Sequence, residues 1–312
     1  MLIGVNERMD FALDGKGLWK LDGQDSVRCL FISGNEMSLR LKDLTVTNGY
    51  ASASSTFGYY GGAIYVGDGA VLEMNGCTVS SSSTASSGKG AGIYVNDATL
   101  TLSNTVVEFN VMYYGKGAGV YLASSSVFSM IGGSIKFNFA RSASCYTSTS
   151  MEGGGLYVEG GSKAIISYGA SIDNNIAFKG GGVFVASDGE LVFVNASLME
   201  NSYWKLYLGA AYYAMYRSGC SSSYAYESYG GGLFANSNAK VVFAGSKVSS
   251  NVAYYHGGGI YLSSGSTALF SACVMSSNYA QHQGGGIYSR DSTTIMNDSA
   301  IVSNNLAGTS NR

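Results

Sequence analysis

Proline is absent from this chain of 312 residues, and charged residues make up only 12% of it. So low a charge, beside 46% hydrophobic residues, argues against a disordered polyelectrolyte. The formal net charge is −2, and no stripe of Lys and Arg runs along the sequence. Because the neutralisation of phosphates needs clustered basic residues, we expect no nucleic-acid partner.

Long apolar runs are also missing. The longest, such as residues 191–195, fall far short of the roughly 20 residues that a membrane-crossing helix needs. We therefore expect no transmembrane segment. Residues 1–8 lack the basic and apolar regions of a secretory signal peptide, so we expect either a protein that is not exported or a fragment of a longer one.

Glycine, with 44 residues, and tyrosine, with 24, are instead abundant. Many of them belong to an anchor segment of the type Gly-Gly-Gly-Ile-Tyr, such as residues 61–65 and 257–261. The aliphatic residue of the anchor recurs at Ile64, Ile93, Val120, Leu156, Val183, Leu233, Ile260 and Ile287. The commonest spacing between them is 27 residues, a period typical of a solenoid.

A second landmark follows each anchor aliphatic after 17 to 19 residues. It is Ser82 once and otherwise an asparagine: Asn110, Asn138, Asn175, Asn201, Asn251, Asn278 and Asn305, with Asn48 before the first anchor. From the landmark to the next anchor the distance varies from 8 to 32 residues. The variation predicts insertions at one corner of the repeat, over residues 51–59, 83–89, 139–152 and 202–229.

Apolar residues alternate between the landmarks, as Leu191 and Phe193 do, and this alternation predicts strands. Three short strands fit into 27 residues. We therefore predict an all-β, right-handed parallel β-helix of about nine to ten coils over residues 25–312, after an N-terminal segment or partial cap at 1–24. The anchor aliphatics should form one buried column.

Two further columns should run along this β-helix. The asparagines suit a left-handed turn whose side-chain amides bond to the coils on either side. The aromatic residue after each anchor aliphatic should point outward, at Tyr65, Tyr94, Tyr121, Tyr157, Phe184, Phe234, Tyr261 and Tyr288. Such a ladder of rings can bind sugars or a partner protein, but packing between coils is the interpretation that we favour.

The Gly-Gly-Ala-Ile of residues 61–64 and the aliphatic-x-x-Asn of residues 248–251 resemble the repeats of chlamydial-type polymorphic outer-membrane protein passengers, within the pectate-lyase-like β-helix superfamily. The resemblance covers residues from about 37 to the end of the chain. It departs from that family where Ile, Val, Leu or Met replaces Phe, and where no barrel follows. It implies an adhesin-like protein that is extracellular or exposed on the cell surface.

Catalytic and metal-binding patterns are weak. β-Helix hydrolases need paired carboxylates, whereas Asp173 stands alone, so we expect no enzyme and no cofactor. His256 and His282 should approach one another at the variable corner, but two histidines make a weak metal site. Asp68, Asp97 and Asp291 follow anchor strands, where turn formation explains them better than calcium does. The five cysteines form no Cys-x-x-Cys pair.

The largest insertion is rich in residues typical of recognition hot spots: Trp204, Tyr207, Tyr212, Tyr213, Tyr216, Tyr224 and Tyr226. In an oxidising compartment we expect a disulfide between Cys145 and Cys220, which lie in insertions at the same corner. Of the two glycosylation sequons, Asn195 should align with Gly245 on the surface, and Asn297 with the inward Phe243.

Taken together, these patterns predict a non-catalytic structural or adhesin-like surface protein that presents the aromatic ladder and the Tyr-rich loop to a glycan or a surface protein. The alternative is a polysaccharide lyase or glycoside hydrolase with a β-helix fold. Uncapped ends of the β-helix would also permit end-to-end or lateral self-association.

Overall fold

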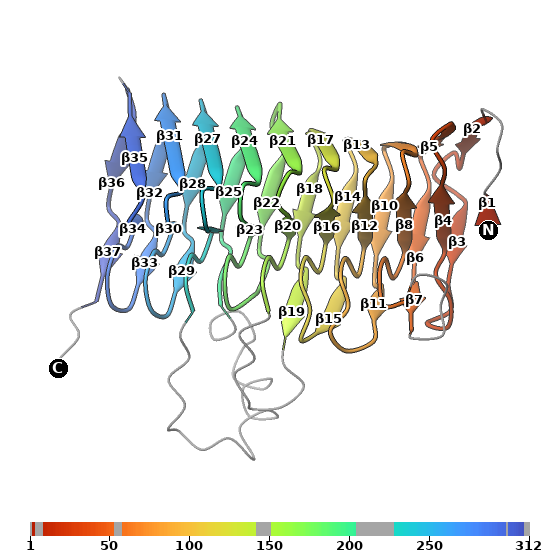
Figure 1. Cartoon of the computed structure of the whole chain (residues 1–312), viewed down its shortest axis with the longest axis horizontal. Coiled ribbons are helices and arrows are strands. Elements are labelled where there is room, and N and C mark those ends of the chain that lie inside the picture. The colour runs from red at the N-terminus through yellow and green to blue at the C-terminus, as the bar shows by residue number, and fades with distance from the viewer. Residues whose placement is uncertain are drawn as a thin grey trace, which may run out of the picture.

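The computed structural model describes residues 2–3, 9–52, 58–141, 151–203, 228–297 and 299–308. Its strands form three parallel sheets of ten strands each, and consecutive strands of a sheet come from successive coils. The coils stack along the long axis of the molecule, with the N-terminus at one end and the C-terminus at the other (Figure 1). The predicted parallel β-helix of about ten coils is thereby confirmed.

The first sheet, called here the anchor sheet, contains β1 (Leu2–Ile3), β4 (Leu30–Ser33), β8 (Ile64–Gly67), β12 (Ile93–Asn96), β16 (Val120–Ala123), β20 (Leu156–Val158), β23 (Val183–Val185), β26 (Leu233–Ala235), β30 (Ile260–Ser263) and β34 (Ile287–Arg290). The second sheet contains β2 (Met9–Asp14), β5 (Met37–Lys42), β9 (Val71–Asn75), β13 (Thr99–Ser103), β17 (Val127–Ile131), β21 (Lys163–Ser167), β24 (Glu190–Val194), β27 (Lys240–Ala244), β31 (Thr267–Ser271) and β35 (Thr293–Met296).

The third sheet contains β3 (Lys20–Asp22), β6 (Thr45–Thr47), β10 (Thr78–Ser80), β14 (Val106–Glu108), β18 (Ser134–Lys136), β22 (Ser171–Asp173), β25 (Ser197–Met199), β28 (Lys247–Ser249), β32 (Val274–Ser276) and β36 (Ile301–Ser303). A short fourth strand follows in several coils. These strands are β7 (Tyr50–Ala51), β11 (Ser83–Thr84), β15 (Val111–Tyr113) and β19 (Phe139–Arg141) in one sheet, and β29 (Val252–Ala253), β33 (Tyr279–Ala280) and β37 (Leu306–Ala307) in another.

The core lies between the three long sheets. The anchor aliphatics pair in register from Ile64 to Ile287, and from Ile64 to Ile260 they are fully buried, as predicted. The corner before each anchor aliphatic requires glycine, because it needs a positive φ and a close approach between backbones. Gly257 has a φ of 69°, and a Cβ on Gly258 would lie 2.4 Å from the carbonyl oxygen of Gly285.

Two predicted boundaries change. The described residues of the predicted N-terminal segment, 2–3 and 9–24, belong to the β-helix, because β1, β2 and β3 pair with β4, β5 and β6. The corner that was predicted to be a loop contains the short fourth strands, with β11 inside the predicted insertion 83–89. A serine and threonine run has no apolar alternation, so the sequence pattern did not mark this strand.

The asparagine column is a continuous ladder that is buried from Asn110 to Asn278, but its turn differs from the prediction. Each side-chain Nδ2 donates to the Oδ1 of the next asparagine, over 2.8 to 3.1 Å from Asn110 to Asn305. The left-handed residue is the one before each asparagine, such as Asn174 before Asn175. Asn48 is itself such a left-handed residue, so Gly49 occupies its place in the ladder, where its backbone N–H donates to Ser82.

One register prediction is wrong. Met296, not Asn297, pairs with Phe270 in the inward column that contains Phe243, and Asn297 is exposed. The turn after β34 and the strand β35 are each one residue shorter than the turn after β30 and the strand β31, and the turn after β35 is two residues longer than the turn after β31. These changes cancel and leave the 27-residue spacing intact, which hid the shift. Asn195 is exposed and lies beside Gly245, as predicted.

The end coils leave part of the inward columns uncovered. Phe11 and Leu13 at one end are 39% and 43% exposed, and Met296 and Val302 at the other are 45% and 50% exposed. Self-association through these ends stays a prediction.

Candidate functional site

The aromatic ladder is a single stack along the outer face of the anchor sheet. It starts at Phe31 and passes through all eight predicted rings to Tyr288, with successive ring centroids 4.6 to 5.4 Å apart. The rings face away from the core, as predicted. They are nevertheless at most 9% exposed from Phe31 to Tyr261, so packing between coils, the interpretation favoured from the sequence, describes most of the ladder.

A second column covers these rings. It consists of the residues that come just before each glycine corner and that pair from coil to coil: Tyr60, Lys89, Lys116, Glu152, Lys179, Tyr229, His256 and Gln283. We call them the cover residues. Several reach the ladder ring of the following coil. Tyr60 stacks on Tyr94 at 4.9 Å, and His256 stacks on Tyr288 at 4.5 Å.

The middle of the cover column is charged. The Lys89 ammonium lies 4.8 Å from the ring centroid of Tyr121, and the Lys116 ammonium lies 5.2 Å from that of Tyr157. Glu152 lies between two lysines, 2.8 Å from Lys116 and 3.9 Å from Lys179. Cations over ring faces are attracted by the ring quadrupole, so these lysines cover the stack without exposing it to water.

Burial under this cover changes the acidity of the phenols. It raises the pKa of Tyr157 to about 12 and raises the pKa of Tyr94 and Tyr121 above the ordinary range, because the charged phenolate is poorly solvated there. The ladder tyrosines therefore remain neutral at physiological pH. They are hydrogen-bonding and packing groups and not bases.

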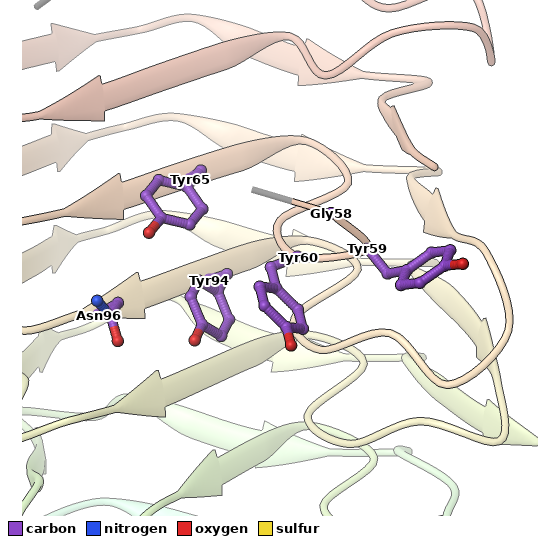
Figure 2. Close-up of a pocket in the computed structure, with 6 residues that line it drawn as sticks. All are labelled: Gly58, Tyr59, Tyr60, Tyr65, Tyr94 and Asn96. Carbon is purple, nitrogen blue, oxygen red and sulfur yellow. The ribbon is translucent and has the colours of Figure 1, made fainter. Parts of the chain in front are cut away.

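A hollow borders the ladder at Tyr65 and Tyr94. Gly58, Tyr59, Tyr60, Tyr65, Tyr94 and Asn96 surround an open hollow of about 460 Å³. Figure 2 shows Tyr94 and Tyr60 side by side, with Asn96 at one end of the row and Tyr59 at the other. Tyr59 is 38% exposed. The site thus combines ring faces, phenol hydroxyls and one side-chain amide.

Two of the six residues that line the hollow were identified from the sequence. Tyr65 and Tyr94 were identified as ladder residues, whereas Tyr59, Tyr60 and Asn96 were not. The residues just before the glycine corners form a column of their own. The recurrence of Tyr, Lys, Lys, Glu and Lys at this position is the sequence signal that could have revealed the cover. Its importance depends on the fold, because only the corner brings each cover residue over the ring of the next coil.

The other predicted recognition residues cannot be placed against this hollow. Trp204, Tyr207, Tyr212, Tyr213, Tyr216, Tyr224 and Tyr226 lie outside the described residues, and so do Cys145 and Cys220. Their recognition role and their disulfide stay predictions. Cys77 and Cys273 lie among the described residues and are buried as free thiols.

The two histidines do approach one another, with ring centroids 6.2 Å apart. The ring of Tyr255 lies 4.4 Å from both imidazoles. The arrangement is an aromatic cluster. Within the described ranges, no group of three or more His, Cys, Asp or Glu side chains gathers in a way that could hold a metal ion.

The aspartates after the anchor strands occupy left-handed turns. Asp68, Asp97 and Asp291 have φ values of 55°, 49° and 50°. Aspartate tolerates this conformation better than most residues, so the turn accounts for them. In the described part of the chain, no helix is long and apolar enough to cross a membrane.

Comparisons with known proteins identify the fold family. The family model described as the right-handed β-helix region matches residues 146–311, slightly more than half of the 312 residues. Neither a curated protein nor a solved structure matches the chain. The stacked parallel coils agree with the family model, whose description also gives the predicted right hand. The chain belongs to the right-handed β-helix family.

Proposed function

We propose that this protein is a non-catalytic recognition module of the cell surface or the extracellular space, and that it binds a glycan in the tyrosine hollow. The observation that carries the proposal is the row of Tyr94, Tyr60 and Tyr59 with Asn96 at its end (Figure 2). The resemblance of the repeats to chlamydial-type surface passengers supports the location and an adhesin-like role.

The chemistry of the hollow favours a sugar over an apolar ligand. A pyranose has one face of C–H groups, which packs on an aromatic ring, and a rim of hydroxyls, which needs hydrogen-bond partners. The phenols of Tyr60 and Tyr94 and the amide of Asn96 supply both donors and acceptors. Rigid stacking of Tyr60 on Tyr94, at 4.9 Å and 17°, holds the site in place before a ligand arrives.

A glycan array probed with the whole chain tests the proposal. We expect binding to a defined subset of oligosaccharides, and a loss of about tenfold or more for Tyr60→Ala, since a ring contact and a hydroxyl contact disappear together. The matched control is Tyr168→Ala, because Tyr168 is a 74% exposed tyrosine on the turn between β21 and β22. Absence of any bound glycan, or equal losses in both variants, would overturn the proposal.

A reducing-sugar assay on the same oligosaccharides separates recognition from catalysis. We expect no release of reducing ends. Release that exceeds the background and survives Tyr60→Ala would favour the alternative, a carbohydrate-active β-helix enzyme with its site elsewhere.

A further inference from the structure

Two phenylalanines occupy positions that cost stability. Phe109 and Phe137 have φ values of 55° and 51°, in the left-handed region that aromatic residues disfavour. The same column holds Asn48, Ser81, Asn174, Glu200, Ser250, Ser277 and Asn304 in seven other coils. Each of these is small or polar. A non-glycine residue held there typically costs on the order of 1–3 kcal/mol, and such strain often marks a functional position.

The two rings are also on the surface. They stack on one another with centroids 5.3 Å apart and planes within 5°. Phe109 is 48% exposed. The stack therefore adds little to the buried core, and the strain falls on a half-exposed residue.

The side of Phe109 away from Phe137 faces small residues of the adjoining coil. Phe137 lies against one face, and the adjoining coil on the other side places Ser81 opposite, because Ser80 pairs with Glu108. Residues 80–83 are all serine, so this part of the adjoining coil offers no large side chain to cover the ring, and Phe109 is 48% exposed. Successive coils are about 4.8 Å apart, which leaves room for one flat ring in the layer above Phe109.

Polar groups surround this layer. Ser81 is exposed and Ser83 is half-buried, the Ser80 hydroxyl donates to Thr47 Oγ1, and the Glu108 carboxylate lies 3.6 Å from the Lys136 ammonium. An aromatic side chain from a partner would cover these polar groups without forming hydrogen bonds to them. The hydroxyls of a pyranose can form such hydrogen bonds.

We propose that the exposed side of Phe109 and the serines at residues 80–83 of the adjoining coil form a second sugar-binding subsite for a pyranose ring. The inference rests on the proposed glycan recognition and extends it. Ser81 and Phe109 belong to the same two coils as Tyr60 and Tyr94, on the other side of the fourth strands. Ser81 is eight residues before Lys89, which pairs with Tyr60 of the hollow, so the backbone between the two corners spans at most roughly 29 Å, and one oligosaccharide can contact both sites.

NMR with selective labels distinguishes the two sites, because the hollow contains tyrosine and the second subsite contains phenylalanine. The probes are the methyl pyranosides of glucose, galactose and N-acetylglucosamine, added to whole protein labelled on Phe or on Tyr. We expect one Phe ring signal to move on titration and to be missing from Phe109→Asn. Asparagine is the residue of this column at 174 and 304, so the variant keeps the turn.

The outcomes separate the two proposals. Movement of Tyr signals alone overturns the second subsite and leaves the hollow standing. Movement of Phe109 alone supports the subsite and overturns the hollow, and movement of neither overturns both. For an oligosaccharide that binds the array, Phe109→Asn should weaken binding roughly three- to tenfold, the value of one ring contact. Unchanged affinity would contradict the subsite.

Discussion

Two columns of side chains run along this solenoid, and they hold it by different means. The asparagine ladder lies inside a corner, where each amide bonds to the coils on both sides. The aromatic ladder lies outside the anchor sheet and is held by stacking and by the cover residues. The inner column is asparagine in seven consecutive coils from Asn110 to Asn305, whereas the outer one alternates freely between Tyr and Phe. A buried column of hydrogen-bonded amides accepts only one type of side chain, whereas a stack of rings accepts any flat aromatic side chain of similar size.

Removing one amide should cost most. Asn201 accepts from the backbone N–H and Nδ2 of Asn175, donates to the carbonyl of Ile172, and donates to Asn251. Asn201→Ala therefore leaves several buried groups without partners. We expect a loss of roughly 4 kcal/mol or more in the free energy of unfolding, measured by urea denaturation.

Asn75→Ala is the matched control, since Asn75 is exposed on β9. It should change stability by less than about 0.5 kcal/mol. Similar losses for both variants would show that the ladder is no stronger than a surface amide.

The aromatic ladder should respond less steeply. Tyr121, only 1% exposed, stacks between Tyr94 and Tyr157 at 5.4 and 4.6 Å. Tyr121→Ala should cost about 3 kcal/mol in thermal or urea unfolding. Tyr121→Phe keeps the ring and should cost less than about 1.5 kcal/mol, the net value of one hydrogen bond. If Tyr121→Phe lowered the free energy of unfolding as much as Tyr121→Ala, hydrogen bonding and not stacking would hold the ladder.

The difference between the columns also decides what the sequence could reveal. Repeats of one residue type, such as the asparagines and the anchor aliphatics, predicted their columns directly, because identical side chains stack only in register. The cover residues escaped notice, since Tyr, Lys, Glu and His share no property but their place before a corner. Phe109 and Phe137 were missed for the same reason. Their strain is visible only as a backbone angle.

Alkaline pH should separate the columns, because only one of them titrates. The pKa of Tyr157 is raised to about 12, and those of Tyr94 and Tyr121 are raised as well. A raised folded pKa gives stability that is present below about pH 10, the ordinary tyrosine value, and is lost as the pH rises through the folded value. We therefore expect unfolding to begin above pH 10, followed by circular dichroism.

Replacing Tyr94, Tyr121 and Tyr157 together with Phe provides the test of that assignment. The triple variant keeps the stack and removes these phenols, so its alkaline midpoint should move to higher pH. An unchanged midpoint would assign the alkaline transition to other groups, such as the Cys29 thiol, whose pKa burial raises to about 11.

The smallest effect is expected in the cover. Lys89 lies over Tyr121 at 4.8 Å and over Tyr60 at 5.6 Å, and its ammonium is 3.9 Å from Glu159. Lys89→Met keeps the aliphatic part of the cover and removes the charge, so it should cost about 0.5–1 kcal/mol. Lys240→Met is the control, because Lys240 pairs with Glu190 at 3.2 Å but meets no ring and is 69% exposed; an exposed pair of that kind is typically worth about 0.2–1 kcal/mol.

A double-mutant cycle of Lys89→Met with Tyr121→Leu decides the mechanism. Coupling of about 0.5 kcal/mol or more would place the cation over the ring as a part of the ladder, and additive losses would reduce Lys89 to an ordinary surface charge.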